Sequence, residues 1–330
     1  MALDEFDRIA TYFAPLSAGH AGAFGLRDDA AVVDVSAGQQ LVVTTDALVE
    51  NVHYLPDDPP LDIACKALRC NLSDLAAMGA TPRGFTFAMA LSSIRDITEN
   101  DGRISSFSNG LRRDIEKWDC PLIGGDSVTS PGPEMLSVTA FGELPIGTAL
   151  RRNGAQPGDR IFVSGSIGDA ALGLRLRRDD VGHGLSQQAA AFLINRFHLP
   201  QPRVALGGGL RGVASACLDI SDGLLQDLRH ICAASGVGAN VHMAALPVSA
   251  AARSALKDAM MTEIGLLSGG DDYELLFTAP ASAVGAVTAA GAAANTKITD
   301  IGEITEEPTV QVLDQNHKAV EITSWGYRHA

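Results

Sequence analysis

Acidic residues recur along the chain in a context that suits metal binding. Aspartates stand beside glycine or hydroxyl residues at six points: Asp28-Asp29, Thr44-Thr45-Asp46, Asn71-Leu72-Ser73-Asp74, Gly124-Gly125-Asp126, Asp219-Ile220-Ser221-Asp222-Gly223 and Gly269-Gly270-Asp271-Asp272. Carboxylate, hydroxyl and carbonyl oxygens are the ligands that Mg²⁺ prefers. Several carboxylates in one cleft repel one another unless cations lie between them. The set therefore predicts several bound magnesium ions and a polyphosphate ligand, which indicates ATP-dependent phosphoryl transfer.

The familiar phosphate-binding signatures are missing from the sequence. It contains no GxxxxGK[ST] loop, no GxGxxG between a strand and a helix, and no protein-kinase motif set. We therefore expect the transferase to work without a P-loop.

The local context of each acid leaves a simpler alternative open. We expect Asp46 to end an apolar strand and Asp126 to follow the short strand 122–123, although a turn or helix-cap aspartate would look the same. Asp74 lies inside an amphipathic helix on the face of Asn71, where polar residues are poor choices unless they face something polar. Asp222 opens a helix, whose N-terminus favours anions, but Ser221 could simply cap it.

Other charged residues lack this context. We interpret Asp57-Asp58, Asp114 and Asp179-Asp180 as solvated surface acids. Arg151-Arg152 could grip a phosphate with a guanidinium group or could equally be ordinary surface charge.

Helix, strand and turn signals alternate along the whole chain, which indicates an α/β fold. In the first half we expect helices over 4–14, 61–78 and 98–118 and strands over 31–35, 41–45, 85–91, 122–123 and 136–141. A polar, turn-rich segment at 151–159 predicts a boundary between two domains, 1–152 and 153–330. Beyond it we expect helices over 169–177, 187–197, 224–234 and 281–294 and strands over 160–164, 216–219, 240–243, 273–278, 298–301 and 310–313.

Composition sets further limits. The chain has 330 residues, of which 46 % are hydrophobic, and 39 acidic against 25 basic side chains give a net charge of −14. Such a surface repels nucleic acid and anionic lipid, so we expect neither as a partner. The acidic N-terminus is unlike a secretory signal, and no apolar run is long enough to cross a membrane. Five scattered cysteines are typical of reduced thiols, and we expect a cytoplasmic protein.

Eight segments, taken in order, closely resemble the thiamine-monophosphate kinases. They are DDAAVV, TTDALVENVHYLP, CKALRCNLSDLAAMGATP, LIGGD, LRRNGAQPGDRIFVSG, LDISDGLLQDL, LSGGDDYELLFT and a terminal WGY. The resemblance covers about residues 28–327 and implies the fold group typified by aminoimidazole ribonucleotide synthetase. It implies an N-terminal mixed sheet with helices that pairs in a homodimer, often as a closed barrel, and a C-terminal α/β domain that completes the site.

The resemblance also implies an activity and its residues. The γ-phosphoryl group of ATP would pass directly to the phosphate of thiamine monophosphate, which gives thiamine diphosphate and ADP, with no protein nucleophile or base. The implied magnesium ligands are Asp29, Thr44, Thr45, Asp46, Asp74, Asp126, Asp219 and Asp222. The implied ATP contacts are Gly125, Asp126, Arg152 and Ser221, and the implied contacts to thiamine monophosphate are His53, Asp271 and Tyr327.

Three positions depart from the family pattern. Arg27 stands where the family usually has glycine, and Asp271 replaces a glutamate, which shortens its reach by one methylene. The C-terminus reads Gly326-Tyr327-Arg328-His329-Ala330, which keeps the aromatic residue and changes those after it. The alternatives are another ATP-using enzyme of the same fold group or a nucleotide- or metal-binding module without turnover.

Overall fold

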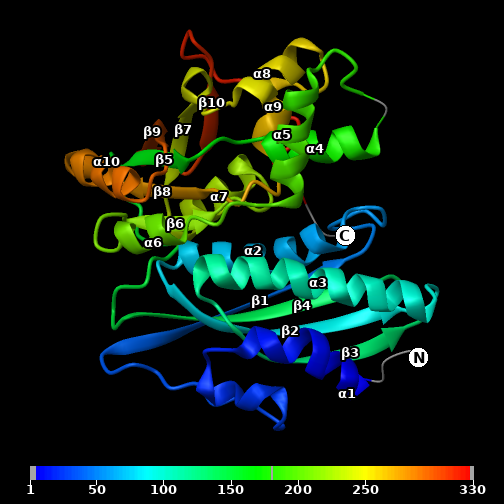
Figure 1. Cartoon of the computed structure of the whole chain (residues 1–330). Helices are drawn as coiled ribbons and strands as arrows, with labels where there is room; N and C mark the ends of the chain where they lie inside the picture. Colours follow the sequence, from blue (N-terminus) through cyan, green and yellow to red (C-terminus); the bar gives the residue numbers. More distant parts are fainter. Residues whose placement is uncertain (1–4, 180, 328–330) are drawn as a thin grey trace. The chain divides into compact units, whose positions relative to one another are not determined.

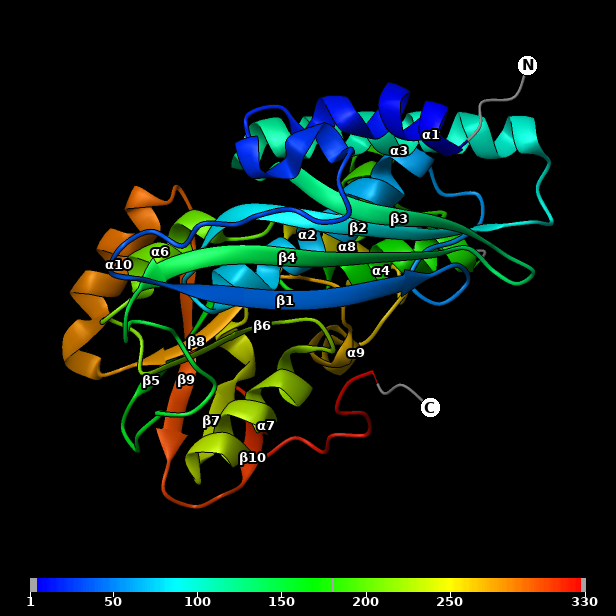
Figure 2. The same cartoon turned by 90° about the horizontal axis from the view of Figure 1, so that it is seen from below.

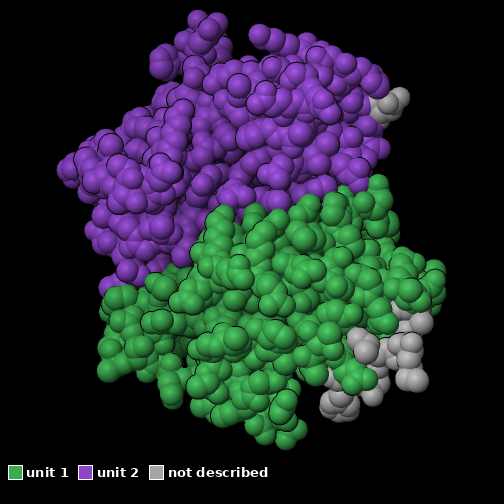
Figure 3. Space-filling view, in the orientation of Figure 1, with its two compact units in different colours: residues 1–75, 80–146 green, residues 76–79, 147–330 purple. Residues whose placement is uncertain are grey.

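The chain forms two compact units. The computed structural model describes residues 5–179 and 181–327. One unit comprises Met1–Leu75 with Ala80–Ile146, and the other comprises Ala76–Gly79 with Gly147–Ala330 (Figure 3). The chain thus changes unit at Leu75/Ala76, Gly79/Ala80 and Ile146/Gly147, and the division at 152/153 stays a prediction.

The first unit is built on a mixed sheet. Its described strands are β1 (Gln39–Val49), β2 (Thr81–Ser92), β3 (Leu122–Ser130) and β4 (Met135–Pro145), in the order β1-β4-β2-β3. Only the β2–β3 pair is parallel. Helices α2 (Pro60–Ala77) and α3 (Ile97–Trp118) accompany the strands, and the strands lie in front of α2 in Figure 2.

Alternation along the strands gives this sheet two different faces. The buried face carries Leu48, Phe85, Phe87, Met89, Leu136, Val138 and Ala140. The other face carries Leu41, Val43 and Val128, which are 40 %, 55 % and 51 % exposed. One face therefore forms the core of the unit, and the other is open to solvent.

The N-terminal segment forms short irregular helices beside β3. They are α1 (Glu5–Arg8), η1 (Ile9–Phe13), η2 (Ala14–Ser17) and η3 (Ala21–Leu26); Asp4, the first residue of the predicted helix, lies outside the described residues. The predicted strand 31–35 is wrong. Its segment is irregular: the Val32 N–H donates to the carbonyl of Gly22, and Val32 and Val35 are exposed. A short apolar run does not form a strand unless a neighbouring strand pairs with it.

The second unit has a six-stranded sheet in the order β10-β7-β9-β5-β8-β6 among the described residues (Figure 1). Its strands are β5 (Arg160–Ser164), β6 (Ala216–Asp219), β7 (Gly238–His242), β8 (Leu275–Ala279), β9 (Ile298–Thr305) and β10 (Val310–Leu313). Its α-helices are α4 (Asp169–Arg178), α5 (Gln187–His198), α6 (Val204–Leu210), α7 (Leu224–Ser235), α8 (Ala250–Lys257), α9 (Glu263–Ser268) and α10 (Val284–Ala293).

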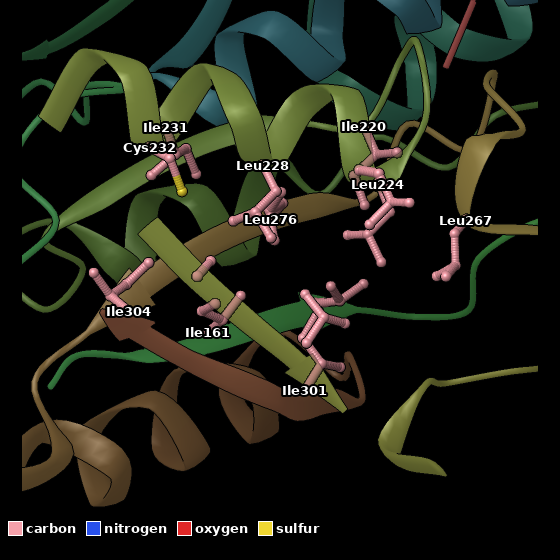
Figure 4. Packing of buried hydrophobic residues seen from close by; sticks show 14 of the residues in the cluster. Ile161, Ile220, Leu224, Leu228, Ile231, Cys232, Leu267, Leu276, Ile301 and Ile304 are labelled. Carbon is pink, nitrogen blue, oxygen red and sulfur yellow. The ribbon is translucent and has the colours of Figure 1, made fainter. Parts of the chain in front are cut away.

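The two faces of this sheet pack against different helices. Leu224, Leu228 and Ile231 of α7 pack on Ile161, Leu276, Ile301 and Ile304 on one side (Figure 4). Leu206 and Leu210 of α6 and Val287 of α10 join Phe162 and Phe277 in a second cluster. Neighbouring strand residues belong alternately to these two clusters. Helices therefore cover both faces of the sheet, and this packing fixes the positions of its strands. No helix in the described part of the chain is long and apolar enough to cross a membrane.

Candidate active site

Three predicted metal ligands meet on the buried face of the first sheet. Thr44 and Asp46 are alternate residues of β1, so their side chains leave the same face of the strand. The Thr44 hydroxyl donates to Oδ2 of Asp74 on α2 at 2.6 Å. The structure therefore brings Thr44, Asp46 and Asp74 together, although the strand continues to Val49 and does not end at Asp46 as predicted.

The charge of this group favours a cation. Burial, followed by the nearby charge of Asp74, raises the pKa of Asp46 to about 6. A divalent ion would remove this repulsion, and two carboxylates with a threonine hydroxyl match the hard oxygen ligands of Mg²⁺. Asn71, one helical turn from Asp74, is fully buried, and its Nδ2 donates to the carbonyl of Ala67.

Thr45 lies on the opposite face. Its hydroxyl donates to the carbonyl of Val138 at 3.1 Å and accepts from the hydroxyl of Thr139 at 3.0 Å. The structure thus does not bring the Thr45 side chain to Thr44 and Asp46, because neighbouring residues of a strand point to opposite faces.

The Gly124-Gly125-Asp126 motif lies inside β3 and not after a strand, which corrects the sequence interpretation. A Cβ at Gly125 would lie 2.1 Å from the carbonyl oxygen of Phe87 on β2. The glycine is therefore required by the close approach of the neighbouring strand. Asp126 is exposed, and its Oδ1 accepts from the Ser127 N–H at 2.9 Å.

A cavity of about 140 Å³ joins this motif to the N-terminal segment. Asp28, Asp29, Gly125 and Asp126 form its polar side, and Phe13, Phe87, Met89 and Leu122 are among its apolar lining. The paired acids and the β3 motif therefore share one pocket. Arg27 has φ −112°, so the backbone there does not require the glycine that is usual in the family.

These two groups stand at opposite edges of the sheet. Asp46 pairs with Val138, Val138 with Phe87, and Phe87 with Gly125. Three strand spacings separate the ends of this row by about 14 Å. A single magnesium ion, with ligands at about 2.1 Å, cannot bind Asp46 and Asp126 of the same chain.

His53 follows β1 in a tight turn. Its Nδ1 accepts from the Val49 N–H at 3.0 Å, and the Lys66 ammonium donates to the His53 carbonyl at 3.0 Å. Because Nδ1 is an acceptor, the proton of the neutral ring sits on Nε2. In this tautomer the ring carries its donor at Nε2.

The second unit gathers predicted residues around the loop after β6. Asp219 ends β6 and is 6 % exposed. The N–H groups of Ser221, Asp222 and Gly223 all donate to Oδ2 of Asp227, each at 3.1 Å. The loop therefore has a fixed conformation, which Gly223 permits with φ +123°.

Asp227 is a residue that the sequence interpretation missed. Burial raises its pKa to about 7, and the charge of Asp222 acts in the same direction. Asp222, Asp227 and His230 each offer a ligand atom within 4.8 Å of the others, so this group could also bind a cation. The sequence signal that could have identified Asp227 is its position in the first turn of α7, where an acid is favoured.

Two predicted substrate contacts reach the same loop. The Asp271 N–H donates to the carbonyl of Ser221 at 2.8 Å, and the Tyr327 N–H donates to the carbonyl of Asp222 at 2.9 Å. Arg152 is exposed, and the carbonyl of its neighbour Arg151 accepts from the Cys217 N–H of β6. The altered residues 328–330 lie outside the described residues.

Two acids that were interpreted as surface are buried. Asp58 is 3 % exposed, and its Oδ2 accepts from the Leu55 N–H at 2.8 Å. Asp114 is 0 % exposed and accepts from Nε and Nη2 of Arg69 at 2.7 and 2.8 Å. Asp114 and Arg69 are 45 residues apart in the chain, so no local sequence pattern predicts this ion pair.

The fold and the site can now be compared with known proteins. Residues 27–144 match the family model described as AIR synthase related protein, N-terminal domain, and residues 156–315 match its C-terminal domain. Two α/β units with acids gathered on their sheets therefore define a protein of the AIR synthase related class.

Comparison with individual relatives identifies the family within this class. The chain is 41 % identical over 305 residues to thiamine-monophosphate kinase of Caulobacter vibrioides, which covers 92 % of this chain and 84 % of the relative. The crystal structure of thiamine-monophosphate kinase from Stenotrophomonas maltophilia K279a has a TM-score of 0.82 and 40 % identity, with 97 % and 99 % of the two chains covered. AaThiL complexed with AMPPCP and TMP has a TM-score of 0.74 and 29 % identity, with 98 % and 97 % covered. The chain belongs to the thiamine-monophosphate kinase family.

Proposed function

We propose that this chain transfers the γ-phosphoryl group of ATP to the phosphate of thiamine monophosphate and releases thiamine diphosphate and ADP. The observation that carries the proposal is the Asp46–Asp74 pair with Thr44, an acidic group whose repulsion a cation relieves. The name of the Caulobacter relative and the AMPPCP and TMP bound to AaThiL support the same reaction.

The chemistry needs positioning more than reactive side chains. Donor and acceptor are both phosphate anions, and a deprotonated phosphate is already nucleophilic. Magnesium would supply the positive charge that lowers their repulsion and stabilises the transferring group. The protein's part is to hold both phosphates in line and to keep the acidic oxygens in place.

We propose roles for the residues by unit. The magnesium ligands would be Asp29, Thr44, Thr45, Asp46, Asp74 and Asp126 of the first unit and Asp219 and Asp222 of the second. ATP would contact Gly125, Asp126, Arg152 and Ser221, and thiamine monophosphate would contact His53, Asp271 and Tyr327. Thr45 could act only through its backbone carbonyl or on the open face, because its hydroxyl is turned away from Asp46.

We infer that two copies of the chain pair through the first sheet. Leu41, Val43, Val128 and Met135 expose large apolar side chains on one face of this sheet, and β1 and β3 are the edge strands among the described residues. If the sheets close into a barrel with β1 of one copy beside β3 of the other, the edge that carries Asp46 would lie beside the edge that carries Asp126 of the partner subunit. These edges are separated by about 14 Å, or about three strand spacings, within one chain, and Asp46 and Asp126 leave opposite faces of their strands.

Mixed dimers test this pairing. Asp46→Asn and Asp126→Asn homodimers should both be inactive, whereas a refolded mixture should regain activity because one of the two sites in each mixed dimer is intact. If the mixture remains inactive while size-exclusion chromatography shows mixed dimers, the acids are not shared between subunits.

We place this activity in the cytoplasm. All five cysteines are buried and none forms a disulfide, as expected for a reducing compartment.

The reaction itself is tested with purified protein, Mg²⁺ and ATP. Thiamine monophosphate should give thiamine diphosphate and ADP in equal amounts, and thiamine should give no product. Phosphorylation of thiamine alone would contradict the proposal. ATP binding without any transfer would favour a nucleotide-binding module.

A further inference from the structure

Two carboxylates follow Asp271 within three residues, and both are buried. Asp272 is 1 % exposed and Glu274 is 0 % exposed. The proposed reaction uses Asp271 and gives these two acids no role. Because an isolated buried charge is costly, each must have partners that explain its position.

Asp272 caps a helix that cannot cap itself. Its Oδ2 accepts from the Gly168 N–H at 2.7 Å, and its Oδ1 lies 3.4 Å from the Ala170 nitrogen at the start of α4. Gly168 is the N-cap residue and has no side chain to fill this role. Burial raises the pKa of Asp272 well above its usual range, and the Gly168 N–H opposes this effect.

Glu274 is held by four donors. Arg203 donates through Nε at 2.6 Å and Nη2 at 2.5 Å, Arg196 donates through Nη2 at 2.9 Å, and the Ser164 hydroxyl donates at 2.6 Å. Gly165 leaves the space for this carboxylate, since a Cβ there would lie 2.1 Å from Oε1 of Glu274. The carboxylate therefore has one permitted position.

The backbone at Asp271 and Tyr273 is strained and is hydrogen-bonded to the loop that contains Ser221. Asp271 has φ +69° and Tyr273 has φ +50°, a region that costs about 1 kcal/mol or more per residue. The N–H groups of Asp271 and Tyr273 donate to the carbonyls of Ser221 and Ile220, each at 2.8 Å. These two hydrogen bonds, together with the buried carboxylates of Asp272 and Glu274 that follow Asp271, are what can maintain such a conformation.

We propose that Asp272 and Glu274 are positioning residues that hold Asp271 in its strained conformation as the contact for the phosphorylated acceptor. Stability alone is a poor reason for this network, because well-packed apolar residues usually stabilise a core as well as buried ion pairs do. The inference rests on the proposed function, since it gives Asp271 its role at the acceptor.

The test begins with wild-type turnover, because absence of thiamine diphosphate there would reject the proposed function and not this inference. In an active protein, Glu274→Gln keeps the volume of the side chain and removes its charge. We expect the KM for thiamine monophosphate to rise by about tenfold while the KM for ATP changes by less than about threefold. Asp114→Asn is the matched control: it weakens another buried carboxylate–arginine pair and should leave both KM values unchanged.

A double-mutant cycle separates positioning from general damage. In an Asp271→Ala background, Glu274→Gln should change the KM for thiamine monophosphate by less than about twofold, because the contact it positions is gone. An equal rise in both backgrounds, or a lower melting temperature with unchanged KM, would overturn the inference. If Glu274→Gln does not fold, Asp272→Asn is measured in the same two backgrounds with the same expected and contrary outcomes.

Discussion

At the scale of single residues, the acids fall into two groups: those that stand in an unusual local context and those that have partners elsewhere in the chain. Asp46 and Asp74 were recognisable because a carboxylate beside threonine on a strand, or beside asparagine within a helix, is unusual without a ligand. Asp114, Asp227 and Glu274 gave weaker signals, since their partners lie on other turns or other elements. The sequence therefore predicts acids in an unusual local context more readily than acids whose partners are distant in the chain.

Asp46 should weaken the fold that it serves. Without metal, burial raises the pKa of Asp46 from 3.8 to about 6. The free energy of unfolding therefore falls as pH rises through this interval, because the buried carboxyl must lose its proton. At 1.36 kcal/mol per pKa unit, Asp46→Asn should raise the free energy of unfolding by about 3 kcal/mol at pH 8 and by almost nothing near pH 3.5. Urea unfolding in EDTA at both pH values measures this difference. A variant less stable than wild type at pH 8 would contradict the raised pKa.

Asp271 replaces a glutamate, and its backbone suggests why aspartate is accepted. At φ +69°, aspartate is tolerated better than most residues, because its short side chain can bond locally. Asp271→Glu should therefore lower the free energy of unfolding by about 0.5–1 kcal/mol. Thermal unfolding compares the two proteins, with Asp258→Glu as a control at a negative φ. Equal losses in both variants would show that backbone strain is not the cause.

At the scale of elements, periodicity predicted most strands and helices, and close contacts decided the rest. The predicted strand 216–219 and helix 98–118 match β6 and, within one residue, α3. The short strand 122–123 extends to Ser130, because Gly125 lets β3 approach β2. Pairing partners fix where a strand ends, and a single segment does not reveal them.

The glycines of β3 offer a matched pair of substitutions. Gly125→Ala would place a Cβ 2.1 Å from the Phe87 carbonyl oxygen, whereas Gly124→Ala would meet only Cγ2 of Thr86 at 3.4 Å. Gly125→Ala should lower the free energy of unfolding by about 2–3 kcal/mol through overpacking, and Gly124→Ala by less than about 1 kcal/mol. Chemical denaturation of both variants tests the difference. Equal effects would mean that the strand spacing does not depend on Gly125.

At the scale of the whole molecule, the two α/β units and their family were predictable from the order of motifs, and the match of both family models agrees. The open sheet face was not visible in the sequence. Exposed and buried strand residues alternate similarly whether or not a second layer covers the sheet, so only the structure shows Val43 and Val128 at the surface.

Dimerisation can be tested on that face. Val43→Glu places a charge at the centre of the proposed interface and should shift the protein from dimer to monomer by at least about tenfold in dissociation constant. Ile94→Glu is the control, because Ile94 is 81 % exposed and lies outside the strands. Sedimentation equilibrium measures both. A Val43→Glu protein that remains as tightly dimeric as Ile94→Glu would reject this face.

The most direct measurement is the rate of thiamine diphosphate formation against free Mg²⁺ for wild type, Asp46→Asn and Asp126→Asn, with circular dichroism to confirm folding. The account predicts no turnover in EDTA, recovery with Mg²⁺, and a loss of at least about 100-fold in both folded variants. Near-normal turnover in both variants, or turnover in EDTA, would contradict it.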